Sequence, residues 1–203
     1  MTTERIGEIV EASTTRLRAV APQTFEGPAF GSFVKTFDSS RTTYGVVAYV
    51  EHVSIDPTRR AIPLGRTWEE LRREQPQVLE LLTTEFEALC VAFAEDGGAL
   101  CAYLPPVPPR VHDFVEACTP DEIGELTDDL SFIRTLGASG LPIVAELIAA
   151  GIRSAATHQK DQRAYLVRAG REVADLFRQD YELASSIIRR IRLPASQTER
   201  ANR

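Results

Sequence analysis

Short apolar segments separated by turn residues fill the first half of the chain. Six of these segments show the period-two alternation, or the β-branched and aromatic content, of strands; they are residues 6–13, 17–21, 31–37, 44–53, 85–94 and 99–104. The last two flank Asp96, Gly97 and Gly98, which supply the positive backbone φ angles of a tight hairpin. Six short strands without a long crossover helix predict a small six-stranded β-barrel.

Two short helices are expected between the fourth and fifth strands. Thr67 and Glu70 form a capping box, in which the threonine hydroxyl accepts a helix N–H and the glutamate reaches back to the threonine N–H. This helix is expected to end near Gln75. Pro76 suits the first turn of a second helix, over residues 77–82, because its missing N–H is not needed there.

A proline-rich run at residues 105–109 separates this strand-rich half from a helical half. Prolines continue neither a central strand nor a helix, so we expect a domain boundary there, with the two parts separable at about residues 105–118. The sequence thus predicts an α+β protein: a barrel at 1–109, a helical domain at 110–194 and a disordered polar tail at 195–203.

Three helices are expected after the proline run. A second capping box, Thr119 with Glu122, begins a helix that should end at Gly137, and another helix spans about 142–157. The third is expected from about residue 161 to residue 191. Apolar residues recur along it at steps of three and four, as on one helix face; they are Leu166, Ala169, Val173, Phe177, Tyr181, Ala184, Ile188 and Ile191.

This third helix is the expected site of protein–protein contact. A helix of about 30 residues spans about 45 Å, which exceeds the diameter of a small barrel. Part of the apolar stripe would then remain uncovered within one chain, and we expect Phe177, Tyr181, Ile188 and Ile191 to form a homo-oligomer interface. The alternative is an intramolecular three-helix bundle that covers the whole stripe.

The charge and the cysteine content of the chain indicate which classes of function and which compartment are expected. The net charge of −6 and pI of about 5.2 argue against a protein that mainly coats DNA or an anionic membrane. The charge is uneven: residues 1–150 carry 12 basic and 23 acidic side chains, and residues 151–203 carry 11 and 6. Three cysteines without close spacing favour a reducing cytoplasm, and no apolar run reaches the roughly 18 residues of a membrane span.

Catalytic signatures are missing from the sequence. Neither glycine-rich turn is followed by the lysine of a phosphate-binding loop, and the three histidines lie far apart. No Gly-x-Ser-x-Gly nucleophile elbow occurs. A two-carboxylate site stays open, because aspartate and glutamate are too common for spacing to decide. We therefore expect a protein that is not an enzyme and holds no cofactor or metal. One alternative is a small enzyme that uses an acidic site.

Arginines on the third helix raise a second alternative, contact with nucleic acid. The candidate residues are Arg168, Arg171, Arg178, Arg189 and Arg190. Acidic residues are interleaved with them, which is more typical of a solvated or ion-paired helix surface. A nucleic-acid-binding module that uses the barrel or this helix is therefore a less favoured alternative.

The strand-rich half resembles the HAS-barrel family, named for HerA-type translocases and ATP synthase. The resemblance covers roughly residues 4–109, and its segments are 7–13 (GEIVEAS), 31–35 (GSFVK), 44–50 (YGVVAYV), 54–57 (SIDP) with Arg59 and Arg60, 74–77 (EQPQ) and 84–86 (TEF). In that family the barrel lies at the N-terminal rim of a ring ATPase. The resemblance implies ring assembly and docking of a partner, such as a HerA-type ATPase or the nuclease that accompanies it.

The chain departs from a complete translocase because helices stand where the ATPase domain would be. DNA translocation is therefore not expected, and no catalytic residue carries over from the family. The function expected from the sequence is a non-enzymatic docking or oligomerisation module of the cytoplasm, accessory to a DNA-processing or DNA-repair machine of HerA type.

Overall fold

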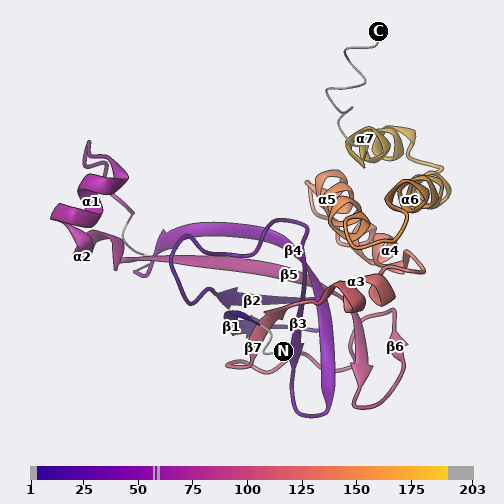
Figure 1. Cartoon of the computed structure of the whole chain (residues 1–203), viewed down its shortest axis with the longest axis horizontal. Coiled ribbons are helices and arrows are strands. Elements are labelled where there is room, and N and C mark those ends of the chain that lie inside the picture. The colour runs from indigo at the N-terminus through magenta and orange to yellow at the C-terminus, as the bar shows by residue number, and fades with distance from the viewer. Residues whose placement is uncertain (1–3, 57, 59, 192–203) are drawn as a thin grey trace, which may run out of the picture.

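A closed six-stranded antiparallel barrel forms the centre of the molecule, and the helices of the C-terminal half pack on one side of it (Figure 1). The computed structural model describes residues 4–56, 58 and 60–191. Within them the barrel strands are β1 (Arg5–Ala12), β2 (Arg16–Val20), β3 (Phe33–Phe37), β4 (Arg41–Ser54), β5 (Leu82–Glu95) and β7 (Phe114–Ala117). The ring runs β2-β1-β7-β3-β4-β5, and β5 pairs with β2 to close it. The predicted α+β class and six-stranded barrel are confirmed.

The sixth barrel strand is not the one that the sequence pattern predicted. The expected strand at 99–104 is reduced to β6 (Leu100–Cys101), which pairs with β5 outside the ring after the turn at Gly97. The ring is completed by β7, which lies between β1 and β3 and follows the proline run. The boundary expected at residue 109 is therefore misplaced, because a barrel strand comes after it.

Two of the expected helices are broken. The helix from Thr119 ends as α3 (Pro120–Leu126), and α4 (Ser131–Gly137) begins after Leu130, whose φ of 59° is left-handed. The single helix expected to end at residue 191 is instead α6 (Gln162–Leu176) and α7 (Tyr181–Ile191). Asp180 marks the second break, since its Oδ1 accepts the N–H of Leu183 at 2.9 Å and caps α7.

The break after α6 lets the helices fold back on one another. Helix α5 (Val144–Ala156) packs against both α6 and α7, and α6 packs against α7. The stripe is thus covered within the chain, but by α5 and by the folding of α7 against α6 rather than by the two preceding helices of the three-helix bundle that the sequence left as an alternative. No helix in the described part of the chain is long and apolar enough to cross a membrane. The tail at 195–203, expected to be disordered, lies outside the described residues.

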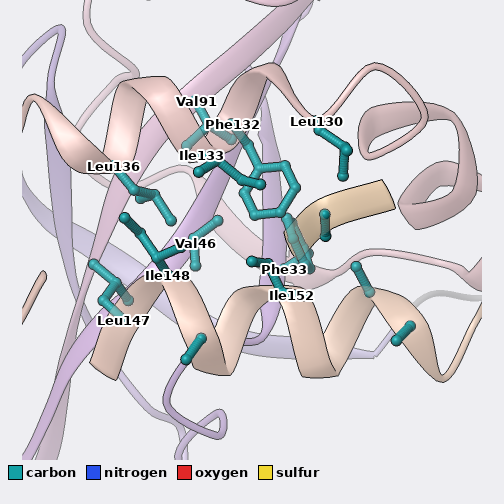
Figure 2. Close-up of a cluster of buried hydrophobic side chains, with 14 of the residues drawn as sticks. Phe33, Val46, Val91, Leu130, Phe132, Ile133, Leu136, Leu147, Ile148 and Ile152 are labelled. Atoms are coloured by element: carbon teal, nitrogen blue, oxygen red, sulfur yellow. The ribbon is translucent and has the colours of Figure 1, made fainter. Parts of the chain in front are cut away.

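The barrel and the helices share one hydrophobic core. Phe33, Val46 and Val91 on the outer face of the barrel pack with Phe132 of α4 and Ile152 of α5 (Figure 2). A second, smaller core fills the barrel itself; its buried members are Ile9, Leu17, Ala19, Val34, Val47, Phe86, Ala88 and Val115. Because the larger core draws on both parts, separate folding of the two halves is not expected.

The backbone of one loop touches helix α5 directly at this junction. Gly31 has a φ of +81°, and its N–H donates to the carbonyl of Val47 at 2.8 Å. A Cβ at this position would lie 2.4 Å from the Cβ of Ala150 and 2.8 Å from its carbonyl carbon. Both the left-handed backbone and the close approach require glycine here.

Candidate docking surfaces

The described residues between 55 and 81 form an arm that projects from the barrel between β4 and β5 (Figure 1). The arm carries α1 (Trp68–Glu74) and α2 (Pro76–Leu79). The predicted capping box is present, with the Thr67 N–H donating to Glu70 Oε2 at 2.8 Å. Pro76 occupies the first turn of α2, also as predicted. The helix ends of the arm are therefore specified by local sequence alone.

No described residue of the arm is buried. Leu71, Val78 and Leu79 are half-buried, and the other large apolar side chains are exposed, with 78% of the surface of Ile62 accessible. The other exposed members are Ile55, Leu64, Trp68 and Leu81. Helices of seven and four residues are far shorter than the 12–15 or so that an isolated helix needs, so packing normally stabilises helices of this kind.

The base of the arm is fixed to the barrel by the loop after β2. The N–H of Phe25 donates to Thr84 Oγ1 at 2.6 Å, and Thr24 Oγ1 donates to the carbonyl of Leu82 at 2.8 Å. The ring of Phe25 also meets the ring of Trp68 edge-on, at 4.7 Å between centroids. These contacts anchor the place where the arm leaves the barrel and leave the apolar residues Ile62 and Leu64 exposed.

Charged residues on the arm are partly paired. Glu74 accepts hydrogen bonds from Arg73, at 2.7 Å, and from Arg66, and these interactions lower the pKa of its carboxyl. Glu69, in the first turn of α1, has no ion-pair partner among the described residues. The arm therefore presents an unpaired carboxylate next to its exposed apolar side chains.

A cleft of about 790 Å³ lies between the barrel and α4. Its apolar wall is made by Leu89, Leu104 and Leu141, and Tyr103 stands beside them. Two arginines, Arg16 and Arg134, also line it, with hydroxyl groups that come from Ser13, Thr15, Thr135 and Ser139. The volume falls in the range of roughly 300–1,000 Å³ that binding pockets usually have.

The four residues predicted to form an oligomer interface are mostly covered within the chain. Ile191 is buried, and Ile188 and Phe177 are half-buried against the core shared by the barrel and the helices. The ring of Phe177 covers Gly137 at the end of α4. Tyr181 is the one residue of the four that is exposed, with 81% of its surface accessible. The predicted patch is therefore not present as one surface, because the break at Asp180 folds α7 back onto α5.

The five predicted arginines do not form one surface of unpaired positive charge, because some of them have partners within the chain. Arg190 pairs with Glu146, and Arg189 donates to the carbonyl of Ser185 at 3.2 Å. Arg168 lies 3.4 Å from Asp128. Within the described part of the chain, Arg171 of α6 and Arg178 in the turn after it have no ion-pair partner, and neither has Arg163 of α6.

Carboxylates gather on the outer surface of the barrel around one arginine. Arg18 contacts Glu51 at 2.5 Å, Glu85 at 2.7 Å and Glu87 at 3.6 Å. Burial lowers the pKa of Arg18, but its hydrogen bond with Glu85 and the three negative charges outweigh this, so the net shift is upward. The cluster is an ion-pair network across β2, β4 and β5. Among the residues described, no group of three or more His, Cys, Asp or Glu side chains is arranged to hold a metal.

Sequence reasoning missed the arm and the cleft as surfaces. It predicted both short helices, although the second ends at Leu79 rather than at residue 82, where β5 already begins. Ile62, Leu64 and Trp68 were the available signal for a contact surface, because apolar residues beside such short helices indicate contact elsewhere. The cleft had no comparable signal, since its lining comes from four separate segments. Comparison with known proteins finds no matching family model and no matching curated protein.

Proposed function

We propose that this protein is a docking and oligomerisation module that binds another protein chain through its arm. The observation that carries the proposal is that the arm contains two helices, the first with a complete capping box, but no buried residue in its described part. Large apolar side chains concentrated on a projecting element are typical of protein contact sites. Burial of Ile62 alone would contribute about 1.5–3 kcal/mol on the scale for large aliphatic side chains.

The resemblance to the HAS-barrel family suggests the kind of machine in which such docking would occur. A HerA-type ATPase, or the nuclease that accompanies it, is the partner class that we propose on this basis. The three cysteines are free thiols, which supports the cytoplasm as the proposed compartment.

A photocrosslinking amino acid at position 62 tests the proposal in cells. We expect position 62 to form protein adducts, because the side chain is highly exposed on the arm. Position 167 is the matched control, since Val167 is an exposed apolar residue on α6, away from the arm. Protein adducts at position 62 that are no more abundant than at position 167 would refute docking through the arm.

Contact with nucleic acid is a second candidate, favoured by three arginines that have no ion-pair partner among the described residues. Arg163 and Arg171 lie on α6, eight residues or about two helical turns apart, and Arg178 lies in the turn that follows this helix. Binding through them would weaken as salt rises. The Arg171→Gln/Arg178→Gln variant should then lose affinity for a single-stranded oligonucleotide, measured by fluorescence anisotropy at two salt concentrations. Unchanged anisotropy curves would exclude this candidate.

A further inference from the structure

We propose that the arm of one copy of this chain docks in the cleft of a second copy, so that copies join head to tail. This inference rests on the proposed function, because it names the partner that the arm binds. The arm and the cleft are two apolar surfaces of the described chain that no other part of the chain covers. One is a projection without a core, and the other is a concavity of about 790 Å³ without an occupant.

The two surfaces are complementary in apolar character. The arm presents Ile62 and Leu64, which are exposed aliphatic side chains. The cleft presents Leu104 and Leu141, with the aromatic ring of Tyr103 beside them. Burial of one set against the other removes apolar surface from water on both partners, which is the main driving force for association.

The two surfaces are also complementary in charge. Arg134, on the last turn of α4, lines the cleft and has no ion-pair partner among the described residues. Arg16 lines it too, and its contact with Glu87 is long, at 3.6 Å, with 60% of the arginine side chain exposed. On the arm, Glu69 in the first turn of α1 is likewise unpaired among the described residues. Opposite charges beside an apolar contact favour this pairing over contact between two clefts, whose charged lining residues are both arginines.

The arm cannot fill the cleft of its own chain. Figure 1 shows α1 and α2 at one end of the longest axis, whereas α4, which borders the cleft, lies toward the other end. The occupant must therefore come from another molecule. A contact between two different surfaces is heterologous, so each bound copy still offers a free arm and a free cleft, and assembly continues into a ring or a filament.

Two variants separate the surfaces. The arm variant is Ile62→Asp/Leu64→Asp, and the cleft variant is Leu104→Asp/Arg134→Glu. Val167→Asp on α6 is the control, because Val167 is exposed and belongs to neither surface. Circular dichroism of each variant checks that the fold is kept, which we expect for the arm variant because its two side chains contribute to no core.

Light scattering across a range of tens of micromolar then measures the mass. We expect the wild type and Val167→Asp to exceed the monomer mass of 22.5 kDa, with a mass that grows with concentration. Each of the two surface variants alone should remain monomeric. An equimolar mixture of both should form a one-to-one dimer of twice the 22.5 kDa monomer mass and nothing larger, since only one intact arm and one intact cleft remain per pair. A charge exchange, Glu69→Arg added to Arg134→Glu, should restore part of the association that Arg134→Glu removes.

A mixture of the two variants that stays monomeric while the wild type associates would overturn the head-to-tail contact. A wild type that is monomeric throughout this range would also overturn it. The adducts of the crosslinker at position 62 give a measurement that does not depend on any folded variant. Adducts that map to residues 103–104 or 134–141 of another copy support the inference. Adducts only with a different protein would overturn it, although docking through the arm would stand.

Discussion

Replacement of Gly31 by alanine should destabilise the whole molecule, because this glycine sits where the barrel meets α5. Its φ of +81° is left-handed, which costs an L-residue about 1–2 kcal/mol. The new methyl group would also lie 2.4 Å from the Cβ of Ala150, and 2.8 Å from a backbone carbon that cannot rotate away. Overpacking of this kind costs about 1–3 kcal/mol. We therefore expect Gly31→Ala to lower the free energy of unfolding by about 2–5 kcal/mol.

Gly140→Ala is the matched control for the packing component. Gly140 also has a left-handed φ, of +71°, but a Cβ there would meet nothing within 4 Å. Its substitution should cost only the backbone component of about 1–2 kcal/mol. Guanidinium chloride titrations followed by circular dichroism measure both values. An equal loss of unfolding free energy in the two variants would refute the close approach of the Gly31 loop to α5.

Three further perturbations test other parts of the fold. Asp180→Ala removes the cap of α7 and should lower the free energy of unfolding by about 0.5–2 kcal/mol in the same titration, whereas no change would argue against the break before α7. Arg18→Gln removes the cation that Glu51, Glu85 and Glu87 share and should cost about 1.5–3 kcal/mol at pH 7. That loss should shrink in acid, where protonation removes the negative charges that Arg18 neutralises, and a loss that does not vary with pH would contradict the network. Burial raises the pKa of Cys90 to about 12 and also raises that of Cys118, so a thiol reagent at pH 8 should modify Cys101 first; equal rates for all three thiols would be inconsistent with this burial.

Features that depend on a few neighbouring residues were predictable from the sequence. Both capping boxes, at Thr67 and Thr119, formed as expected because the hydroxyl and the carboxylate reach the first N–H groups of the same turn. The hairpin turn at Gly97 formed for a similar local reason, its φ being +68°. The first five barrel strands also followed from their alternation and their turn residues.

Features that depend on distant partners were not predictable. Strand β7 has only four residues, and it is a strand because it fits between β1 and β3, which are about 80–110 residues away along the chain. The apolar residues from Phe177 to Ile191 keep their helical spacing across the break between α6 and α7, so the periodicity gave no sign of that break. The cap residue Asp180 was the local signal for that break. Whether Tyr181 or Ile191 would be exposed depended on how α7 packs on α5, which a single helix pattern does not specify.

The position of β7 sets an order of events during synthesis on the ribosome. Strands β1 and β3 emerge early, but the gap between them stays open until residue 117 has been made. Until then the nascent sheet has two unpaired edges, which are prone to pair with other chains. The proline run at 105–109 precedes the closing strand, and a peptide bond before proline that isomerises slowly would prolong this open stage. A nascent chain stalled before residue 114 should therefore bind chaperones, and one stalled after the whole of β7 has left the ribosome should release them.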